Sequence, residues 1–415
     1  MNPPIEYSVF YYHWGMEKKR ILIVNKFYYP RGGDCIVAMN LERLLKQQGH
    51  DVGVFAMHYP GNIDSGWNDY YASQVDMAGG ASAKWKAFKR IMGWGDIRRS
   101  FCRMLDDFKP HIVHLHNIHS YLSPVVAQLA KQRGCRVVWT LHDFKLVCPS
   151  YSCLLDGKPC ERCLGHSKMS VLKTRCMKGS LAASAMAFLE ARKWNRYKLD
   201  EVTDAFICPS RFMASKMSKD GFDDSKLHVV CNHIDPEKLE LFNALDVERE
   251  DYYAYVGRLS HEKGVETLLE VAARLPIKLK IAGDGPLLEV LRQQYSTASH
   301  IKFLGHQAAS QVAKLLSTAR FSVMPSECYD NNPLGVIESL CAGTPVVGAR
   351  IGGIPELLNE DNGLTFYSGN KDELYNVIKA AIDNKWDNAS IKSVAIKRFS
   401  VEEHLRMIED IYQSI

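Results

Sequence analysis

The sequence lacks the features that mark membrane-spanning, secreted and nucleic-acid-binding proteins. No stretch of its 415 residues approaches the ~18–20 consecutive apolar residues of a membrane-spanning helix. The N-terminal segment lacks the basic start and uninterrupted apolar stretch of a secretory signal. The net charge is only +5, and the chain has neither a basic stripe nor a nucleic-acid recognition motif. We therefore expect no nucleic-acid partner, whereas an anionic ligand or an anionic membrane surface would suit this charge.

Cysteine is plentiful, but a disulfide framework is not expected. The chain has twelve cysteines and no secretory signal, a combination typical of a reducing compartment. We expect a cytoplasmic protein. Hydrophobic residues make up 46% and charged residues 24%, as in ordinary globular proteins, and 415 residues favour two domains over a single core.

Short apolar runs alternate with helical periodicity twice along the chain. In the first half, a strand at 21–24 precedes an apolar 3.6-residue rhythm that ends at Gly49, and strands are predicted at 50–55, 111–117 and 135–143. The alternation restarts in the second half. It predicts an α/β fold of two Rossmann-like doubly wound domains that face a central cleft. The predicted segments are a disordered extension or upstream start choice (1–15), a first domain (16–235) with a cysteine-rich insertion (146–180), a second domain (236–398) and a terminal amphipathic helix that returns to the first domain (399–415).

Two cations flank a loop between a strand and a helix of the second half. Arg258 and Lys263 follow a strand that ends at Gly257, and Gly264 precedes the next helix. An arginine fork, a lysine point charge and helix amide donors together suit a diphosphate. The alternative is that both side chains are ordinary solvated loop cations.

Two acidic residues stand eight positions apart further along the chain. Asp330 lies in a loop rich in Asp and Asn, and Glu338 lies in the first turns of the following helix. Carboxylates there would accept hydrogen bonds from sugar and ribose hydroxyls, while the amides around Pro333–Val336 could face phosphate. The alternative makes Asp330 a helix cap and Glu338 a buried partner of that cap.

In order and spacing these motifs resemble the donor domain of the retaining GT-B glycosyltransferases of family 4. The matching pieces are Gly257-Arg258 to Lys263-Gly264, the Gly-x-Gly-Pro turn at Gly283–Pro286, the acidic-x7-Glu motif, and the AGTPVV and GGIPE segments. The resemblance covers nearly the whole chain from about residue 19. It departs at one position, because the family usually has Glu where this chain has Asp330; Glu327 is nearby and could substitute.

The resemblance implies that Arg258 and Lys263 hold the diphosphate of a nucleotide-sugar donor. It also implies that Asp330 contacts the sugar and Glu338 the ribose. The further residues predicted to line the donor site are Gly283, Glu327, Asn331, Asn332, Pro333, Leu334, Gly335 and Val336. The implied reaction transfers a sugar, with retention, to a hydroxyl of a glycan or lipid-linked acceptor in polysaccharide or glycolipid biosynthesis. The alternatives are a nucleotide-sugar epimerase and a non-catalytic nucleotide-sugar-binding protein of the same fold.

The first domain supplies further candidates on the same comparison. Gly32 and Gly33 resemble the family's glycine-rich loop against the donor phosphates and the acceptor; the alternative is a simple tight turn. His142 follows a predicted strand, where a family histidine contacts the transferred sugar. Asn117 and His119 fall just past another strand end and are secondary candidates.

Two other histidines, His114 and His116, share one face of a predicted strand. We expect buried, hydrogen-bonded rings there rather than metal ligands, since the family needs no catalytic metal. Without a well-placed carboxylate nucleophile, retention suggests front-face substitution, in which the leaving diphosphate itself takes the proton of the acceptor hydroxyl.

The insertion and one basic segment add two further expectations. A structural zinc is predicted at Cys148, Cys160, Cys163 and Cys176, with Cys153 or His166 as substitutes; the alternative is reduced, unligated thiols. The segment at 84–99 mixes Trp85 and Trp94 with lysines and arginines, which suits a helix on an anionic membrane at the inner face of the cell membrane. The alternative is a helix packed on its own sheet with a solvated basic rim.

Overall fold

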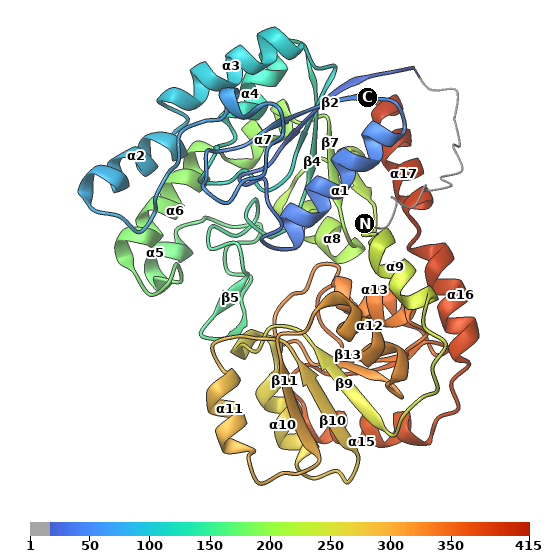
Figure 1. Ribbon diagram of the computed structural model, residues 1–415. Helices are drawn as coiled ribbons and strands as arrows, with labels where there is room; N and C mark the ends of the chain where they lie inside the picture. The colour runs from blue at the N-terminus through green and yellow to red at the C-terminus, as the bar shows by residue number, and fades with distance from the viewer. Residues whose placement is uncertain (1–16) are drawn as a thin grey trace. The chain divides into compact units, whose positions relative to one another are not determined.

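The computed structural model describes residues 17–415 of the chain (Figure 1). The extension predicted at 1–15 lies outside the described residues. The chain separates into two compact units, one ending at Trp139 and one beginning at Thr140. The domain boundary predicted between residues 235 and 236 stays a prediction.

The first sheet has six strands in the order β2-β1-β3-β4-β7-β8, and the strand pairs with a resolved register are parallel. Its strands are β1 (Arg20–Val24), β2 (Asp51–Phe55), β3 (Ile112–Leu115), β4 (Arg136–Thr140), β7 (Ala205–Cys208) and β8 (Leu227–Val229). Most positions of the first five strands are buried, as expected of parallel strands covered on both faces. The sequence therefore predicted β1, β2, β3 and β4 correctly, whereas β7 and β8 were not among the predicted strands.

Helices connect these strands in the alternating pattern that the sequence predicted. They include α1 (Gly33–Gln47), α2 (Ala81–Ile91), α3 (Asp96–Phe108), α4 (Val125–Gln132), α6 (Leu181–Lys193), α7 (Arg196–Val202) and α8 (Arg211–Asp220). The predicted end of the first helix is confirmed. Gly49 has a φ of 89° directly after the C-cap residue Gln48, and glycine adopts this left-handed backbone without the strain of a Cβ.

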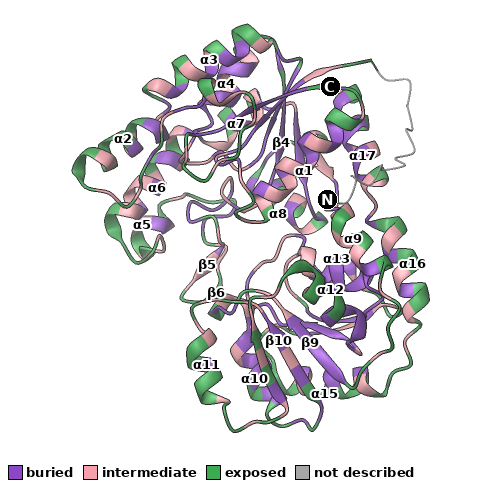
Figure 2. Ribbon diagram, viewed as in Figure 1, coloured by how far each residue is buried: buried purple, intermediate pink, exposed green. Residues whose placement is uncertain are grey.

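The second sheet also has six parallel strands, in the order β11-β10-β9-β12-β13-β14. Its strands are β9 (Tyr252–Val256), β10 (Lys278–Ala282), β11 (Ile301–Gly305), β12 (Ser322–Met324), β13 (Val346–Ala349) and β14 (Gly363–Phe366). Its helices are α9 (Pro236–Asn243), α10 (Val265–Ala272), α11 (Leu288–Gln294), α12 (Ala309–Thr318), α13 (Leu334–Cys341), α14 (Ile354–Leu357) and α15 (Lys371–Asp383), followed by α16 (Asn388–Arg398) and α17 (Val401–Ser414). Figure 2 shows β9 buried in the interior while α11 carries an exposed face.

The cysteine-rich insertion forms a small structure of its own. An antiparallel pair, β5 (Leu154–Leu155) and β6 (Lys158–Pro159), is joined through Asp156 and Gly157, whose φ values of 51° and 75° fit a tight hairpin turn. The short helix α5 (Ser170–Thr174) follows.

The single helix predicted at 84–99 is wrong. The segment contains the end of α2 and the start of α3, separated by a break in which Gly93 and Gly95 have φ values of 73° and 92°. Arg90, expected on the basic rim, is buried and donates to the carbonyl of Tyr121 and to Asp96. Within residues 17–415, no helix is both long and apolar enough to cross a membrane.

Candidate functional site

The loop after β9 carries the two predicted cations. The Tyr255 hydroxyl donates to the carbonyl of Arg258 at 2.8 Å and so fixes the backbone where the strand ends. The side chain of Arg258 is exposed, and it has no ion pair with another described residue. Lys263 is the last residue of a 3-10 turn (His261–Lys263), two residues before α10 begins at Val265.

The Gly-x-Gly-Pro turn after β10 packs directly against this loop. A Cβ on Gly283 would lie 1.9 Å from the carbonyl oxygen of Gly257, and a Cβ on Gly285 would lie 2.3 Å from that of Leu259. The amide of Leu259 in turn donates to the carbonyl of Asp284 at 2.9 Å. Only glycine permits this approach, so the two glycines set the place of the Arg258 loop.

Lys263 meets the acidic loop between β12 and α13. Its ammonium lies 2.5 Å from Oδ1 of Asp330, while the Ser326 hydroxyl donates to Oδ2 of the same carboxylate at 2.5 Å. Burial by itself lowers the pKa of Lys263, but the charge and hydrogen bond of Asp330, with smaller contributions from Cys328 and Glu262, together raise it. Lys263 therefore stays protonated at neutral pH.

The backbones of the two loops also touch. A Cβ on Gly264, whose φ is 65°, would lie 2.0 Å from the carbonyl oxygen of Pro325. The amide of Glu327 donates to the carbonyl of Glu262 at 2.9 Å, and its carboxylate accepts from Thr267 at 2.6 Å. The structure thus brings Asp330 into contact with Lys263, whereas Glu327 is held by α10.

Helix α13 begins as the sequence suggested, but Asp330 does not cap it. The N-cap residue is Pro333, and no side chain caps this end of the helix. The capping alternative for Asp330 is therefore wrong, and the first turn, Leu334 to Val336, keeps amides that no side chain satisfies. Glu338 is buried and lies 2.5 Å from the ammonium of Lys238 on α9.

The two asparagines of the acidic loop are held by the protein itself. Asn331 accepts from the Ser210 hydroxyl at 2.7 Å and donates to the carbonyl of Leu141 at 3.0 Å. Asn332 accepts from the amide of Asn232 at 3.0 Å. The bond to Leu141 brings the loop within one residue of His142, which follows β4 and is half-buried.

The GGIPE segment approaches the acidic loop from β13. A Cβ on Gly352 would lie 2.3 Å from the carbonyl oxygen of Asp330, and a Cβ on Gly353 would lie 1.8 Å from that of Asn331. The Glu356 carboxylate accepts from the first two amides of α8, at 2.7 and 2.6 Å. These contacts are favourable because the N-terminus of a helix attracts negative charge.

The candidates of the first domain form a second group, at the start of α1 and just after β3 and β4. Asn117 donates from its side chain to Asp34 at 3.0 Å, which places it beside Gly32 and Gly33 at the start of α1. No atom lies within 4 Å of a Cβ built on Gly33, so packing does not require glycine there. His119 stacks on Trp139 with ring centroids 5.3 Å apart.

Two groups of residues in the chain have side chains of the kinds that bind metals: the histidines at the end of β3 and the cysteines of the insertion. His114 and His116 are buried, and their rings stack at 4.7 Å, in agreement with the expectation that they lie in the core. No group of three or more His, Cys, Asp or Glu side chains in the described part of the chain is arranged to hold a metal. The geometry therefore gives no support to a zinc held by Cys148, Cys160, Cys163 and Cys176, and the zinc site stays a prediction.

One pair of these thiols does interact. Cys148 and Cys153 are joined by a side-chain hydrogen bond, which lowers the pKa of Cys148 to about 6, and the Cys148 thiol also lies 3.2 Å from the Ser150 hydroxyl. Cys153, considered only as a substitute ligand, is thus a side-chain partner of Cys148.

Sequence reasoning missed the residues that hold the predicted site in place. Ser326 and Lys238 each bind one of the two predicted carboxylates, and Glu356 joins the acidic side of the site to α8. Ser326 lies two residues after the end of the apolar strand β12, and this place at a strand end could have marked it. No local signal marks Lys238, because its partner lies 100 residues away.

Two family models match the chain. Residues 31–238 match Glycosyltransferase Family 4, and residues 237–398 match Glycosyl transferases group 1. A similar protein of Klebsiella pneumoniae, "Uncharacterized 42.6 kDa protein in cps region", is 26% identical over 355 residues, which are 81% of this chain and 87% of that protein.

Two solved structures share the fold over nearly the full length. Anabaena HepE in complex with UDP aligns with a TM-score of 0.64 at 18% identity, covering 95% of this chain and all of that one. The lipopolysaccharide outer core galactosyltransferase WaaB, in its apo form, aligns with a TM-score of 0.67 at 16% identity, covering 95% and 99%.

Proposed function

Because the chain belongs to glycosyltransferase family 4 and has the two-domain GT-B fold, we propose that it transfers a sugar with retention of configuration. The donor is a nucleotide diphosphate sugar, and the acceptor is a hydroxyl of a glycan or lipid-linked molecule. Family membership makes the chain a glycosyltransferase, of class EC 2.4, which favours this function over an epimerase or a non-catalytic binding protein.

One observation carries the donor assignment. The exposed guanidinium of Arg258 and the protonated ammonium of Lys263 lie in the loop after strand β9. The N-terminus of α13, which no side chain caps, lies close to the end of that strand, since a Cβ on Gly335 would lie 3.8 Å from the carbonyl oxygen of Val256. Arginine forks, ammonium groups and free helix amides are the groups that bind a diphosphate. That Anabaena HepE was crystallised with UDP supports a ligand of this class.

The proposed roles follow from these contacts. Arg258 and Lys263 bind the diphosphate and stabilise the charge that grows on it as the bond to the sugar breaks. Asp330, already held by Lys263, contacts the sugar, and Glu338 accepts a hydrogen bond from the ribose. His142, joined to the acidic loop through the carbonyl of Leu141, lies against the transferred sugar.

The acceptor side is assigned to the group at the start of α1. Gly33 leaves open space there, so a ligand can approach the backbone. We propose a glycan or lipid-linked acceptor in polysaccharide or glycolipid biosynthesis at the cytoplasmic face of the membrane. Trp85, 56% exposed, and Trp94, 46% exposed, stand among lysines and arginines on and after α2, which supports contact with anionic lipid.

The experiment is a panel of UDP-, GDP- and ADP-sugars. Thermal shifts should identify one donor base, because a ligand that binds only the folded state raises its stability. With that donor, release of the nucleoside diphosphate should depend on an acceptor, and NMR of the product should show the anomeric configuration of the donor. Release without acceptor together with an altered free sugar would favour an epimerase instead, and an inverted product would contradict retention.

A further inference from the structure

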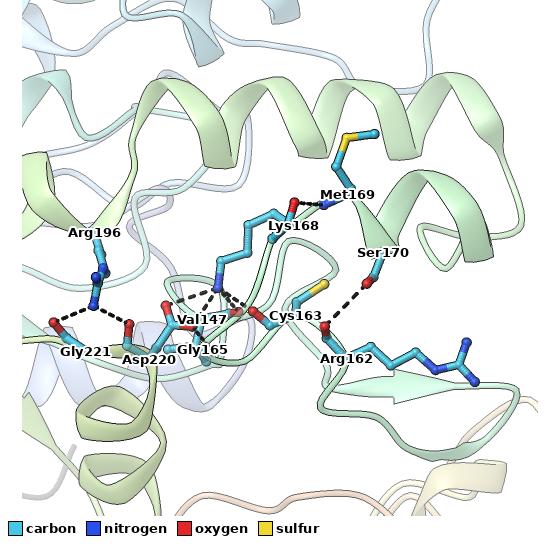
Figure 3. Close-up of polar contacts among 11 residues, drawn as sticks. Val147, Arg162, Cys163, Gly165, Lys168, Met169, Ser170, Arg196, Asp220 and Gly221 are labelled. Atoms are coloured by element: carbon cyan, nitrogen blue, oxygen red, sulfur yellow. Dashed lines mark hydrogen bonds and ion pairs between the residues drawn. The ribbon is translucent and has the colours of Figure 1, made fainter.

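The cysteine-rich insertion is the part of the chain that the proposed reaction does not use, and it is firmly anchored on α8. The ammonium of Lys168 donates to the carbonyls of Val147 and Cys163, both at 2.8 Å, and to the buried carboxylate of Asp220 at 2.7 Å. The amide of Gly165 donates to the same carboxylate at 2.7 Å. Figure 3 shows Lys168 at the centre of this anchor.

A second ionic cluster joins the insertion to α8 one turn earlier. Glu161, inside the Cys-x-x-Cys turn, lies 2.5 Å from the ammonium of Lys216 and 3.2 Å from that of Lys219. Burial raises the pKa of Glu161, but hydrogen bonds from Lys216 and Tyr329 outweigh it and lower the pKa to about 2. Glu161 is therefore ionised at neutral pH.

The third donor to this carboxylate comes from the acidic loop of the donor site. The Tyr329 hydroxyl donates to Oε1 of Glu161 at 2.8 Å across 168 residues of sequence. The Tyr329 ring packs edge-on against Phe212, at 4.8 Å between centroids, and against Phe144 at 6.0 Å. The phenol is thereby held on one side by charge and on the other by aromatic contacts.

Tyr329 directly precedes Asp330, so its position affects the carboxylate that pairs with Lys263. The amide of Asp330 donates to the carbonyl of Cys328, and its carbonyl accepts from Gly353 at 2.7 Å. The backbone is thus hydrogen-bonded at Cys328 and at Asp330, the two residues on either side of Tyr329.

We infer that Glu161 is a positioning residue for Asp330 that acts through the hydroxyl of Tyr329. The inference rests on the proposed function, in which Asp330 contacts the transferred sugar. The insertion thereby contributes to the donor site without touching the substrate: α8 holds Glu161, Glu161 holds Tyr329, and Tyr329 sets the place of Asp330.

The test compares Glu161→Gln, Tyr329→Phe and the double variant with wild type, using the donor selected by the UDP-, GDP- and ADP-sugar panel. Each single variant should lower kcat roughly tenfold, at the lower end of what a hydrogen bond to a charged group contributes. Affinity for the free nucleoside diphosphate should stay within about twofold, because Arg258 and Lys263 are untouched. The double variant should lose no more than Tyr329→Phe alone, since Tyr329→Phe removes the bond to Glu161 and Glu161→Gln replaces the charged acceptor of that same bond by a neutral one.

Arg162→Gln is the matched control, because Arg162 is exposed in the same turn and its side chain has no ion pair with another described residue. It should keep wild-type kcat. A merely structural role of the turn would instead lower thermal stability and the fraction of binding-competent protein in proportion to kcat. Wild-type kcat in Glu161→Gln, equal losses in Arg162→Gln, or losses that multiply in the double variant would each overturn the inference.

Lys263→Ala in the same series separates this inference from the proposed function. Full activity in Lys263→Ala with a loss in Glu161→Gln would contradict the diphosphate assignment and leave the link from Glu161 to the site standing. Loss in Lys263→Ala with full activity in Glu161→Gln would leave the proposed function standing and overturn the link.

Discussion

Replacing Lys263 by alanine perturbs the donor site in two ways that the structure separates. The first is loss of the cation that, in the proposed function, stabilises charge on the leaving diphosphate; this loss should lower kcat by about 10²–10³. The second is electrostatic. Asp330 keeps Ser326 but loses the cation 2.5 Å away, so a neutral pair becomes a net negative charge. At about 5 Å and an effective dielectric constant of about 20, a phosphate charge would be repelled by roughly 3 kcal/mol.

The two effects require different readouts. Calorimetry with the nucleoside diphosphate measures binding, and initial rates at saturating donor measure kcat. Lys263→Ala should weaken binding and lower kcat, whereas the double variant Lys263→Ala/Asp330→Asn should recover part of the binding but none of the kcat. Lys302→Ala, which removes an exposed lysine on β11, is the control for an unspecific loss of positive charge.

Two results would refute this reasoning separately. Wild-type kcat in Lys263→Ala, with normal folding by circular dichroism, would remove Lys263 from the leaving-group site. Binding by the double variant that is no tighter than that of Lys263→Ala would show that the unpaired charge of Asp330 does not act on the ligand.

Four further predictions test other parts of the structure. Gly283→Ala should lower the free energy of unfolding by about 1–3 kcal/mol, measured in urea, because the new Cβ would lie 1.9 Å from a backbone oxygen at a φ of +143°; an unchanged midpoint contradicts the packing argument. Arg258→Ala should weaken binding of the nucleoside diphosphate more than it lowers kcat at saturating donor. A larger loss of kcat than of binding would contradict the proposal that Arg258 binds the incoming diphosphate. Burial, and then the charge of a neighbouring histidine, lowers the pKa of His404 to about 3. Below pH 6.5 the unfolded chain therefore binds one proton more than the folded chain, and roughly 2 kcal/mol of folding stability should be lost by pH 5. In urea unfolding, His404→Gln should show a smaller change of stability between neutral pH and pH 5. Wild-type protein should co-sediment with anionic vesicles but not with neutral ones. The variant Trp85→Ala/Lys89→Glu should abolish this binding, since both side chains are exposed on α2. Equal sedimentation of the variant would favour a helix that packs on its own domain and does not bind membranes.

The sequence predicts the parts of the fold that depend on short-range patterns. Continuous apolar runs located β1 and β9 because strands buried on both faces need apolar side chains at every position. Gly283 could be recognised from its motif, although the steric reason, the oxygen of Gly257, appears only in three dimensions. The spacing of Asp330 and Glu338 correctly placed one before the helix and the other inside it.

What the sequence could not predict depends on contacts between distant segments. Asn331 was expected to face a substrate, but its amide group is engaged by Ser210 and by the carbonyl of Leu141, 121 and 190 residues away. From the sequence, Arg90 was expected to be one more exposed cation of a basic segment. In the structure it is buried, and its partners are the carbonyl of Tyr121 and the carboxylate of Asp96. Burial of a charged side chain requires partners that only the folded chain supplies.

The three cations of the proposed donor site, Arg258, Lys263 and Lys238, differ in whether a carboxylate neutralises them. Asp330 holds Lys263 and Glu338 holds Lys238, each at 2.5 Å, so both pairs are close to neutral before a ligand arrives. Among the described residues, Arg258 alone of these three cations has no carboxylate partner. In the proposed function, an incoming diphosphate would therefore meet uncompensated positive charge at Arg258. The pairing with Asp330 raises the pKa of Lys263 and keeps its ammonium charged in a partly buried place, where in the proposed function it would face the leaving group. Asp330 thus binds Lys263 through one carboxylate oxygen and Ser326 through the other, and in the proposed function it would also contact the sugar.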